Sequence, residues 1–163
     1  MNPNLYILSS RIFPLYLLLF SHICADYLCQ SKWFVCRKRQ NNLFLLFHVF
    51  LIWFFAFLFF LPYRNGKVIA VITTLAISHL VIDKSKIRLK KERPEINKKL
   101  LNVIDQCFHF FLIFLTWRVF LFDFSLPDFF SGHPAVLNYL AVLIVSLIIY
   151  KAITGLSEKE ERK

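Results

Sequence analysis

Histidine and aspartate recur four residues apart inside strongly apolar segments of this chain. His22 and Asp26 lie in HICADYLCQ at the end of a hydrophobic run, and Gln30 follows one turn later. His79 and Asp83 repeat the pattern in AISHLVIDKSK. A helix advances about 100° per residue, so side chains four apart share a face. Each segment therefore predicts one helical face that carries an imidazole and a carboxylate.

Two further apolar segments add to this pattern. Asp105 and His109 are four apart in reverse order, and His48 stands alone in LLFHVF. Imidazole nitrogen and carboxylate oxygen are ligands for zinc, manganese and iron. Zinc is the favoured divalent ion, with manganese or iron as alternatives. The candidate metal ligands are His22, Asp26, His48, His79, Asp83, Asp105 and His109.

Three kinds of function fit such a set. The leading hypothesis is a metal-dependent hydrolase, in which a bound ion activates water and one aspartate serves as general base. The candidate bases are Asp26, Asp83 and Asp105, and the candidate substrate-binding residues are Gln30, Lys86 and Gln106. One alternative is a cation or proton transporter or channel that uses the same groups. The other is a non-enzymatic regulatory membrane protein, in which the pairs only hold helices together.

The elements that carry these residues read as membrane spans. The chain has 163 residues, 58% of them hydrophobic, and a span needs about 20 mostly apolar residues. The sequence predicts an all-α, polytopic transmembrane helix bundle in which residues 1–155 form a single domain, residues 156–163 form a charged cytoplasmic tail, and the first span is retained rather than cleaved. The five predicted spans are residues 6–29, 43–61, 67–84, 99–122 and 134–153.

Basic loops predict the orientation of these spans. Lys and Arg gather in the loops near residues 31–42 and 84–99, whereas the two other loops hold few or none. The positive-inside rule makes the basic side cytoplasmic, with the N-terminus outside and the C-terminus inside a bacterial inner membrane. We expect both basic segments to be loops, with Pro94 as a helix stop.

This orientation places the polar groups of four spans at one depth. All lie within about 15 Å of the cytoplasmic boundary, at 1.5 Å per residue. A charged group inside a span costs about 2.5–3.5 kcal/mol and usually faces the bundle interior or a watery cavity. We therefore expect the seven side chains to converge in one pocket.

The net charge of +10 bears on partners. Basic loops attract membrane lipids with anionic headgroups, so we expect an anionic headgroup or small molecule as substrate. Nucleic acid is not expected, because no aromatic side chains interleave a soluble basic face. The fifth predicted span has no histidine or acid and is a candidate homo-oligomer contact. No Walker loop, G-x-S-x-G or H-E-x-x-H motif is present, which leaves any chemistry to the His/Asp residues.

The order of these motifs resembles an uncharacterised family of small bacterial integral membrane proteins, domain of unknown function 3307. The resemblance covers about residues 15–120 and rests on HxxxD followed by YLCQ, the lone span histidine, SHLVIDKSK and DQCFH. It implies a multi-span bundle with polar motifs and no established activity. A more distant similarity connects it to membrane-bound metal-dependent hydrolases. Their usual His-Arg-Gly loop motif is missing here, so that likeness is analogy alone.

Overall fold

The computed structural model describes residues 3–63 and 65–123, and every regular element among them is helical. Within this part, four helices are long and apolar enough to cross a membrane. They are α1 (Pro3–Ile23), α3 (Asn42–Phe59), α4 (Gly66–Glu92) and α5 (Lys98–Thr116). The predicted helical bundle is thus confirmed, whereas the predicted fifth span and the tail lie outside the described residues.

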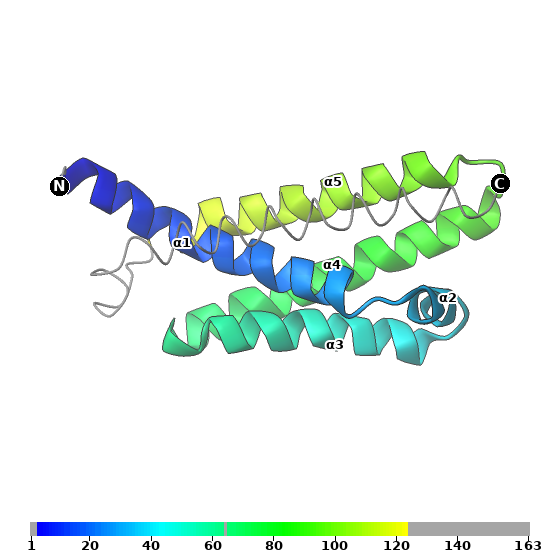
Figure 1. Ribbon diagram of the computed structural model, residues 1–163, viewed down its shortest axis with the longest axis horizontal. Helices are drawn as coiled ribbons and strands as arrows, with labels where there is room; N and C mark the ends of the chain where they lie inside the picture. The colour runs from blue at the N-terminus through cyan, green and yellow to red at the C-terminus, as the bar shows by residue number, and fades with distance from the viewer. Residues whose placement is uncertain (1–2, 64, 124–163) are drawn as a thin grey trace.

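The four long helices run lengthwise beside one another (Figure 1). Helix α1 contacts α3, α3 contacts α4, α4 contacts α5, and α5 contacts α1, so the neighbours close a ring. Short turns extend or join them: π-helical turns η1 (Cys24–Leu28) and η3 (Trp117–Leu121) continue α1 and α5, and the 3₁₀ turn η2 (Leu61–Tyr63) follows α3. The centre of the ring is where inward-facing side chains must meet.

Four helices begin after a Ser or Asn residue whose side chain caps the first turn. The caps are Ser31, Asn41, Asn65 and Asn97, which precede α2 (Lys32–Gln40), α3, α4 and α5 respectively. Each side-chain oxygen accepts a hydrogen bond from a backbone N–H in the first turn, at 2.8–3.2 Å. Such caps contribute about 0.5–2 kcal/mol each. They fix where the helices start, and hence the register of the inward faces.

The two basic segments are more helical than predicted. The first was expected to be a loop but contains α2, which is capped by Ser31 and buries Phe34 against the ring of Phe44 on α3. In the second, α4 runs on to Glu92, and Arg88 pairs with Glu92 at 2.6 Å on the exposed side. Good helix formers continue α4 beyond the apolar span. The predicted stop at Pro94 is confirmed.

The inward faces of α3, α4 and α5 are apolar except at one level, where each carries polar side chains. On α4 the buried stripe begins with Val68, Ile72 and Ala76 and continues into His79 and Asp83. The buried stripe of α5 is Leu101, Asp105, His109 and Ile113, and that of α3 is Leu45, His48, Ile52 and Ala56. The apolar half forms a core that includes Leu18, Phe60, Ile72 and Leu121. The polar side chains therefore occupy one level of the bundle.

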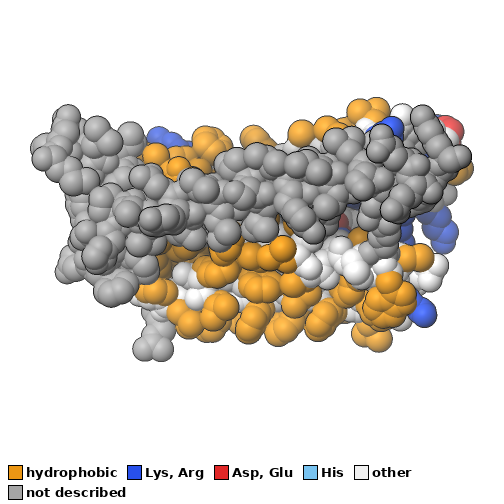
Figure 2. All heavy atoms as spheres, in the orientation of Figure 1, with side chains coloured by type: hydrophobic (Ala, Val, Ile, Leu, Met, Phe, Trp, Pro, Cys, Tyr) orange, Lys and Arg blue, Asp and Glu red, His pale blue; other side chains and the backbone are white. Residues whose placement is uncertain are grey.

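The outer faces are suited to lipid. Large apolar side chains such as Phe47, Phe50, Ile77, Phe108 and Phe111 are half exposed or more. Figure 2 shows hydrophobic atoms along the length of the visible face, with Lys and Arg gathered where α2 and the turn between α4 and α5 lie. We call this the basic end. Helix α2 is seen nearly end-on in Figure 1, so it runs across the direction of the long helices.

Candidate metal centre

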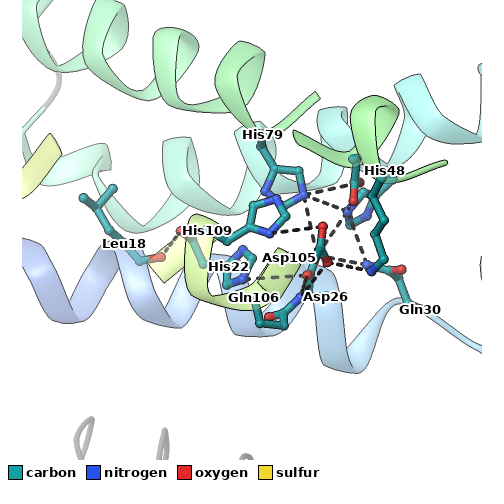
Figure 3. A network of polar contacts seen from close by, with 12 residues as sticks. Leu18, His22, Asp26, Gln30, His48, His79, Asp105, Gln106 and His109 are labelled. Atoms are coloured by element: carbon teal, nitrogen blue, oxygen red, sulfur yellow. Dashed lines mark hydrogen bonds and ion pairs between the residues drawn. The ribbon is translucent and has the colours of Figure 1, made fainter. Parts of the chain in front are cut away.

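All seven predicted ligands converge at one place inside the bundle. Figure 3 labels all of them but Asp83, whose Oδ2 atom lies 3.4 Å from His48 Nε2. They come from α1 with η1, α3, α4 and α5, and none of their side chains is more than 8% exposed. We call this set the His/Asp cluster: His22, Asp26, His48, His79, Asp83, Asp105 and His109. The convergence predicted from helical spacing is what the structure has.

His48 lies at the centre of the tightest part of the His/Asp cluster. Its Nε2 atom is 3.0 Å from Asp26 Oδ1 and 3.4 Å from Asp83 Oδ2. The same atom is 3.1 Å from His79 Nε2. His79 Nε2 lies 3.8 Å from Asp26 Oδ1 and 3.5 Å from Asp83 Oδ2. Ligands about 2.0–2.1 Å from a tetrahedral zinc ion are roughly 3.3 Å apart, so donor atoms at this spacing could hold one.

A π-helical turn delivers Asp26 to this group. Residues Cys24–Leu28 form η1, in which the N–H of Cys29 donates to the carbonyl of Cys24 at 3.1 Å. The wider turn changes the direction of Asp26 relative to His22. Their closest atoms, His22 Nε2 and Asp26 Oδ2, are 3.7 Å apart, whereas Asp26 reaches His48 on α3 at 3.0 Å. Single π-helical turns often occur at functional sites.

The other two histidines extend the His/Asp cluster toward α5. The ring of His109 lies 3.9 Å from that of His79 and 5.3 Å from that of His22, measured between centroids. Asp105 Oδ1 lies 3.9 Å from His109 Nδ1. The His/Asp cluster contains three groups of three residues, each of which could hold an ion. Within each group the donor atoms lie within 4.8 Å of one another. The groups are His22, Asp26 and His79; His48, His79 and Asp83; and Asp83, Asp105 and His109.

Gln30 and Gln106, the two glutamines predicted to bind substrate, both donate hydrogen bonds to the Asp26 carboxylate. Gln30 donates to Asp26 Oδ1 at 2.9 Å, and Gln106 donates to Asp26 Oδ2 at 3.2 Å. The Gln30 amide is also 3.2 Å from His48 Nε2, and that of Gln106 is 3.5 Å from Asp105 Oδ2. The structure thus places them beside the carboxylates, where they fix the direction of the oxygens. Contact with a substrate remains a prediction for both.

Two lysines neutralise the remaining carboxylates. Lys86 donates to Asp105 Oδ2 at 2.6 Å, from the helical face shared with His79. Lys38 on α2 donates to Asp83 Oδ2 at 2.9 Å, and its side chain is 10% exposed. From the sequence, the basic segment near residues 31–42, which includes Lys38, was expected only to set the topology of the spans. The signal that could have found it is the cap at Ser31 before KWFVCRKRQ, which indicates a helix with Lys38 on a definite face.

A cleft joins the His/Asp cluster to the basic end. It has a volume of about 510 Å³ and is lined by Asp26, Asp83, Asp105 and both glutamines. Its basic lining residues are Lys38, Arg39, Lys86, Lys90, Lys91 and Lys98. Lys90 is also engaged with the turn after α4, where it donates to the carbonyls of Pro94 and Ile96. The cleft therefore has a carboxylate floor and cationic walls, an arrangement that receives cations at its base and anions at its mouth.

One comparison with known proteins matches the chain. A family model described as "Protein of unknown function (DUF3307)" covers residues 14–137, which include the whole His/Asp cluster and more than half of the chain. No curated protein and no solved structure matches. The match agrees with the order of the polar motifs in the sequence, and the chain belongs to the DUF3307 family.

Proposed function

We propose that this protein is a membrane-embedded, metal-dependent hydrolase that acts on anionic substrates at the basic end of its bundle. The observation that carries the proposal is the arrangement around His48. Donor atoms of Asp26, His79 and Asp83 lie 3.0–3.4 Å from its Nε2 atom, although they come from two other elements, η1 and α4. Mutual distances of this size are expected of ligands to one ion.

Electrostatics supports a bound cation. Charged groups in a span cost about 2.5–3.5 kcal/mol each and are kept where something offsets that cost. Lys38 and Lys86 offset the charges of Asp83 and Asp105. Among the described residues, Asp26 has amide and imidazole neighbours but no lysine or arginine partner. A divalent ion would supply the missing positive charge, with zinc favoured by the imidazole ligands and manganese or iron as alternatives.

The cleft indicates the class of substrate. An ion at its floor would lower the pKa of a bound water toward 7. The lysines of the mouth would hold a phosphate ester, and a carboxylate of the floor would take the proton of the water. Water oxygen bonds to phosphorus, the bond from phosphorus to the ester oxygen breaks, and the proton ends on the departing alcohol.

Transport is less favoured by the packing on the other side of the His/Asp cluster. Beyond His22, His79 and His109 the described helices enclose a cavity of only about 10 Å³, lined mainly by leucine and isoleucine. The apolar core fills the bundle further along, with Leu18 and Leu121 fully buried. Among the described residues, the buried polar groups therefore extend from the basic end only partway along the bundle. This arrangement suits a site that is entered from one face. By the positive-inside rule, that face is cytoplasmic.

The test measures metal and activity together. The full chain, purified in detergent, is stripped with a chelator, reloaded with Zn²⁺, Mn²⁺ or Fe²⁺, and analysed for metal content. Hydrolysis of p-nitrophenyl phosphate and bis(p-nitrophenyl) phosphate is then followed. We expect tight binding of at least one ion and activity that His79→Ala removes, with Glu92→Gln as a folded control on the exposed side of α4. Metal content near zero in the wild type, unchanged by His79→Ala, contradicts the proposal.

A further inference from the structure

The His/Asp cluster has more donors than one ion accepts. Structural and catalytic zinc ions have four or five ligands, and water occupies at least one position in a catalytic site. The seven side chains form three donor groups, and neighbouring groups share a member. His79 belongs to the first and second groups, and Asp83 belongs to the second and third. A shared carboxylate between two donor groups is the usual framework of a two-metal site.

We infer that the centre holds two divalent ions bridged by the Asp83 carboxylate. This inference rests on the proposed function and extends it. The first ion is the one held by His48, His79 and Asp83, with Asp26 beside them. The second is held by Asp83, Asp105 and His109, which lie within 4.8 Å of one another by their donor atoms. In two-metal hydrolytic sites the ions are about 3.5–4 Å apart, a separation that one bridging carboxylate sets.

Unsatisfied polar atoms mark the second position. Both ring nitrogens of His109 are buried without a hydrogen-bond partner, as is Asp105 Oδ1. His109 is 2% exposed and Asp105 is 4% exposed. A buried polar atom left unpaired costs about 1–3 kcal/mol, so native structures rarely keep several together. The 3.9 Å between His109 Nδ1 and Asp105 Oδ1 is too long for a hydrogen bond, and both residues belong to a donor group that could hold an ion.

The charges around the second position set a condition on ion binding. The carboxylates of the proposed second site, on Asp83 and Asp105, are those that Lys38 and Lys86 contact at 2.9 and 2.6 Å. Because these ammonium groups neutralise the two carboxylates in the metal-free protein, the second ion would have to displace them. With both ions bound, four positive charges would face the three carboxylates of the His/Asp cluster. The excess suits an anionic phosphate ester and a bound hydroxide, and it frees both lysines to contact the substrate.

The experiment counts ions and tests whether they interact. The stripped, full-length protein is loaded with Mn²⁺ or Zn²⁺ in detergent, dialysed and analysed for ions per chain, and the Mn²⁺ form is examined by electron paramagnetic resonance. We expect two ions per wild-type chain and the spectrum of an exchange-coupled Mn²⁺ pair. Asp105→Asn should retain one ion with an isolated six-line signal, Asp83→Asn should lose the coupling, and Glu92→Gln should keep both ions.

The outcomes separate this inference from the proposed function. One ion per wild-type chain, or two ions without exchange coupling, overturns the bridged pair and leaves a metal-dependent hydrolase standing. No ion in the wild type overturns both. Folding of each variant is checked by gel filtration and circular dichroism. If Asp105→Asn does not fold, His109→Gln removes a ligand of the same ion, and an unchanged count of two ions in that variant counts against the inference.

Discussion

The Nε2 atoms of His48 and His79 lie 3.1 Å apart although α3 and α4 present the two rings from different sides. At this distance either one ring donates to the other, or both nitrogens face a common cation. The carboxylate oxygens of Asp26 and Asp83 lie 3.0 and 3.4 Å from the same His48 nitrogen, and under the proposed function all four side chains face one ion. The two histidines should therefore behave as one functional unit.

This relationship predicts non-additive mutations. His48→Ala and His79→Ala should each weaken Zn²⁺ binding by more than about 100-fold, since changes that reach only the outer shell cost 10–100-fold. The double variant should bind little worse than either single variant, because residues that share one ion are energetically coupled. Competition against a zinc chelator measures the three affinities. Fully additive losses would show that the two rings serve separate sites.

Lys38 should affect substrate and metal in opposite directions. Its ammonium contacts Asp83 Oδ2, the oxygen that also faces His48 and His79. Lys38→Met should tighten Zn²⁺ binding, because the ion no longer competes with the ammonium for that oxygen. The same change should weaken inhibition by inorganic phosphate by about tenfold or more, the value of a lost charge-assisted hydrogen bond.

Lys84→Met is the matched control for this prediction, because Lys84 is the exposed neighbour of Asp83 on α4. It removes the same charge without touching the His/Asp cluster. Equal effects of Lys38→Met and Lys84→Met on phosphate inhibition would reduce Lys38 to a contributor of general surface charge.

The His/Asp cluster was predictable because helical periodicity and membrane cost act together. Residues such as His79 and Asp83 share a helical face because they are four residues apart. Exposing these polar side chains to lipid is unfavourable, so the shared face must point into the bundle. Which residues would converge followed from these two constraints. The distances did not, because they depend on how α3, α4 and α5 pack.

Two contributions to the centre were beyond the sequence analysis for physical reasons. Lys38 turns inward, but it lies in a segment whose Lys and Arg content is already explained by topology, so nothing in the composition singles it out. The π-helical turn at Cys24–Leu28 follows from tertiary packing rather than from any strong local propensity. Both place side chains through contacts between elements, information that spacing along one helix does not carry.

Gln106 should act as a positioning residue. Its amide donates to Asp26 Oδ2 at 3.2 Å and bridges toward Asp105 on its own helix. Gln106→Ala should leave the ligands in place but free the Asp26 carboxylate to rotate, lowering Zn²⁺ affinity about tenfold. Gln106→Glu should be worse, since it places a fourth carboxylate beside two others. Gln40→Ala, on the exposed side of α2, should have no effect on affinity, and a similar loss there would point to a general disturbance of the basic end.

Removing the charge of Asp26 should raise the stability of the metal-free protein but weaken metal binding. Its side chain is 8% exposed, and no lysine or arginine of the described residues pairs with it. Asp26→Asn removes a buried charge, and its amide oxygen can still accept a hydrogen bond from Gln30, while its NH₂ group can donate to Gln106 Oε1 once that side-chain amide turns over. The metal-free variant should therefore unfold at a higher temperature than the metal-free wild type, by about 2–4 °C for each 1 kcal/mol gained.

The same variant should lose the stabilisation that metal provides. An ion at a concentration of 100 times its dissociation constant raises the free energy of unfolding of the wild type by about 2.7 kcal/mol. With Zn²⁺, Asp26→Asn should show little of this increase. Thermal unfolding in detergent, with and without Zn²⁺, gives both quantities, and Glu92→Gln should match the wild type in each. A metal-free Asp26→Asn protein less stable than the wild type would mean that hydrogen bonds to the carboxylate outweigh its burial cost. The His/Asp cluster would then be a structural network complete without an ion, because its negative charge would already be stabilised by the amides, the imidazoles and the two lysines.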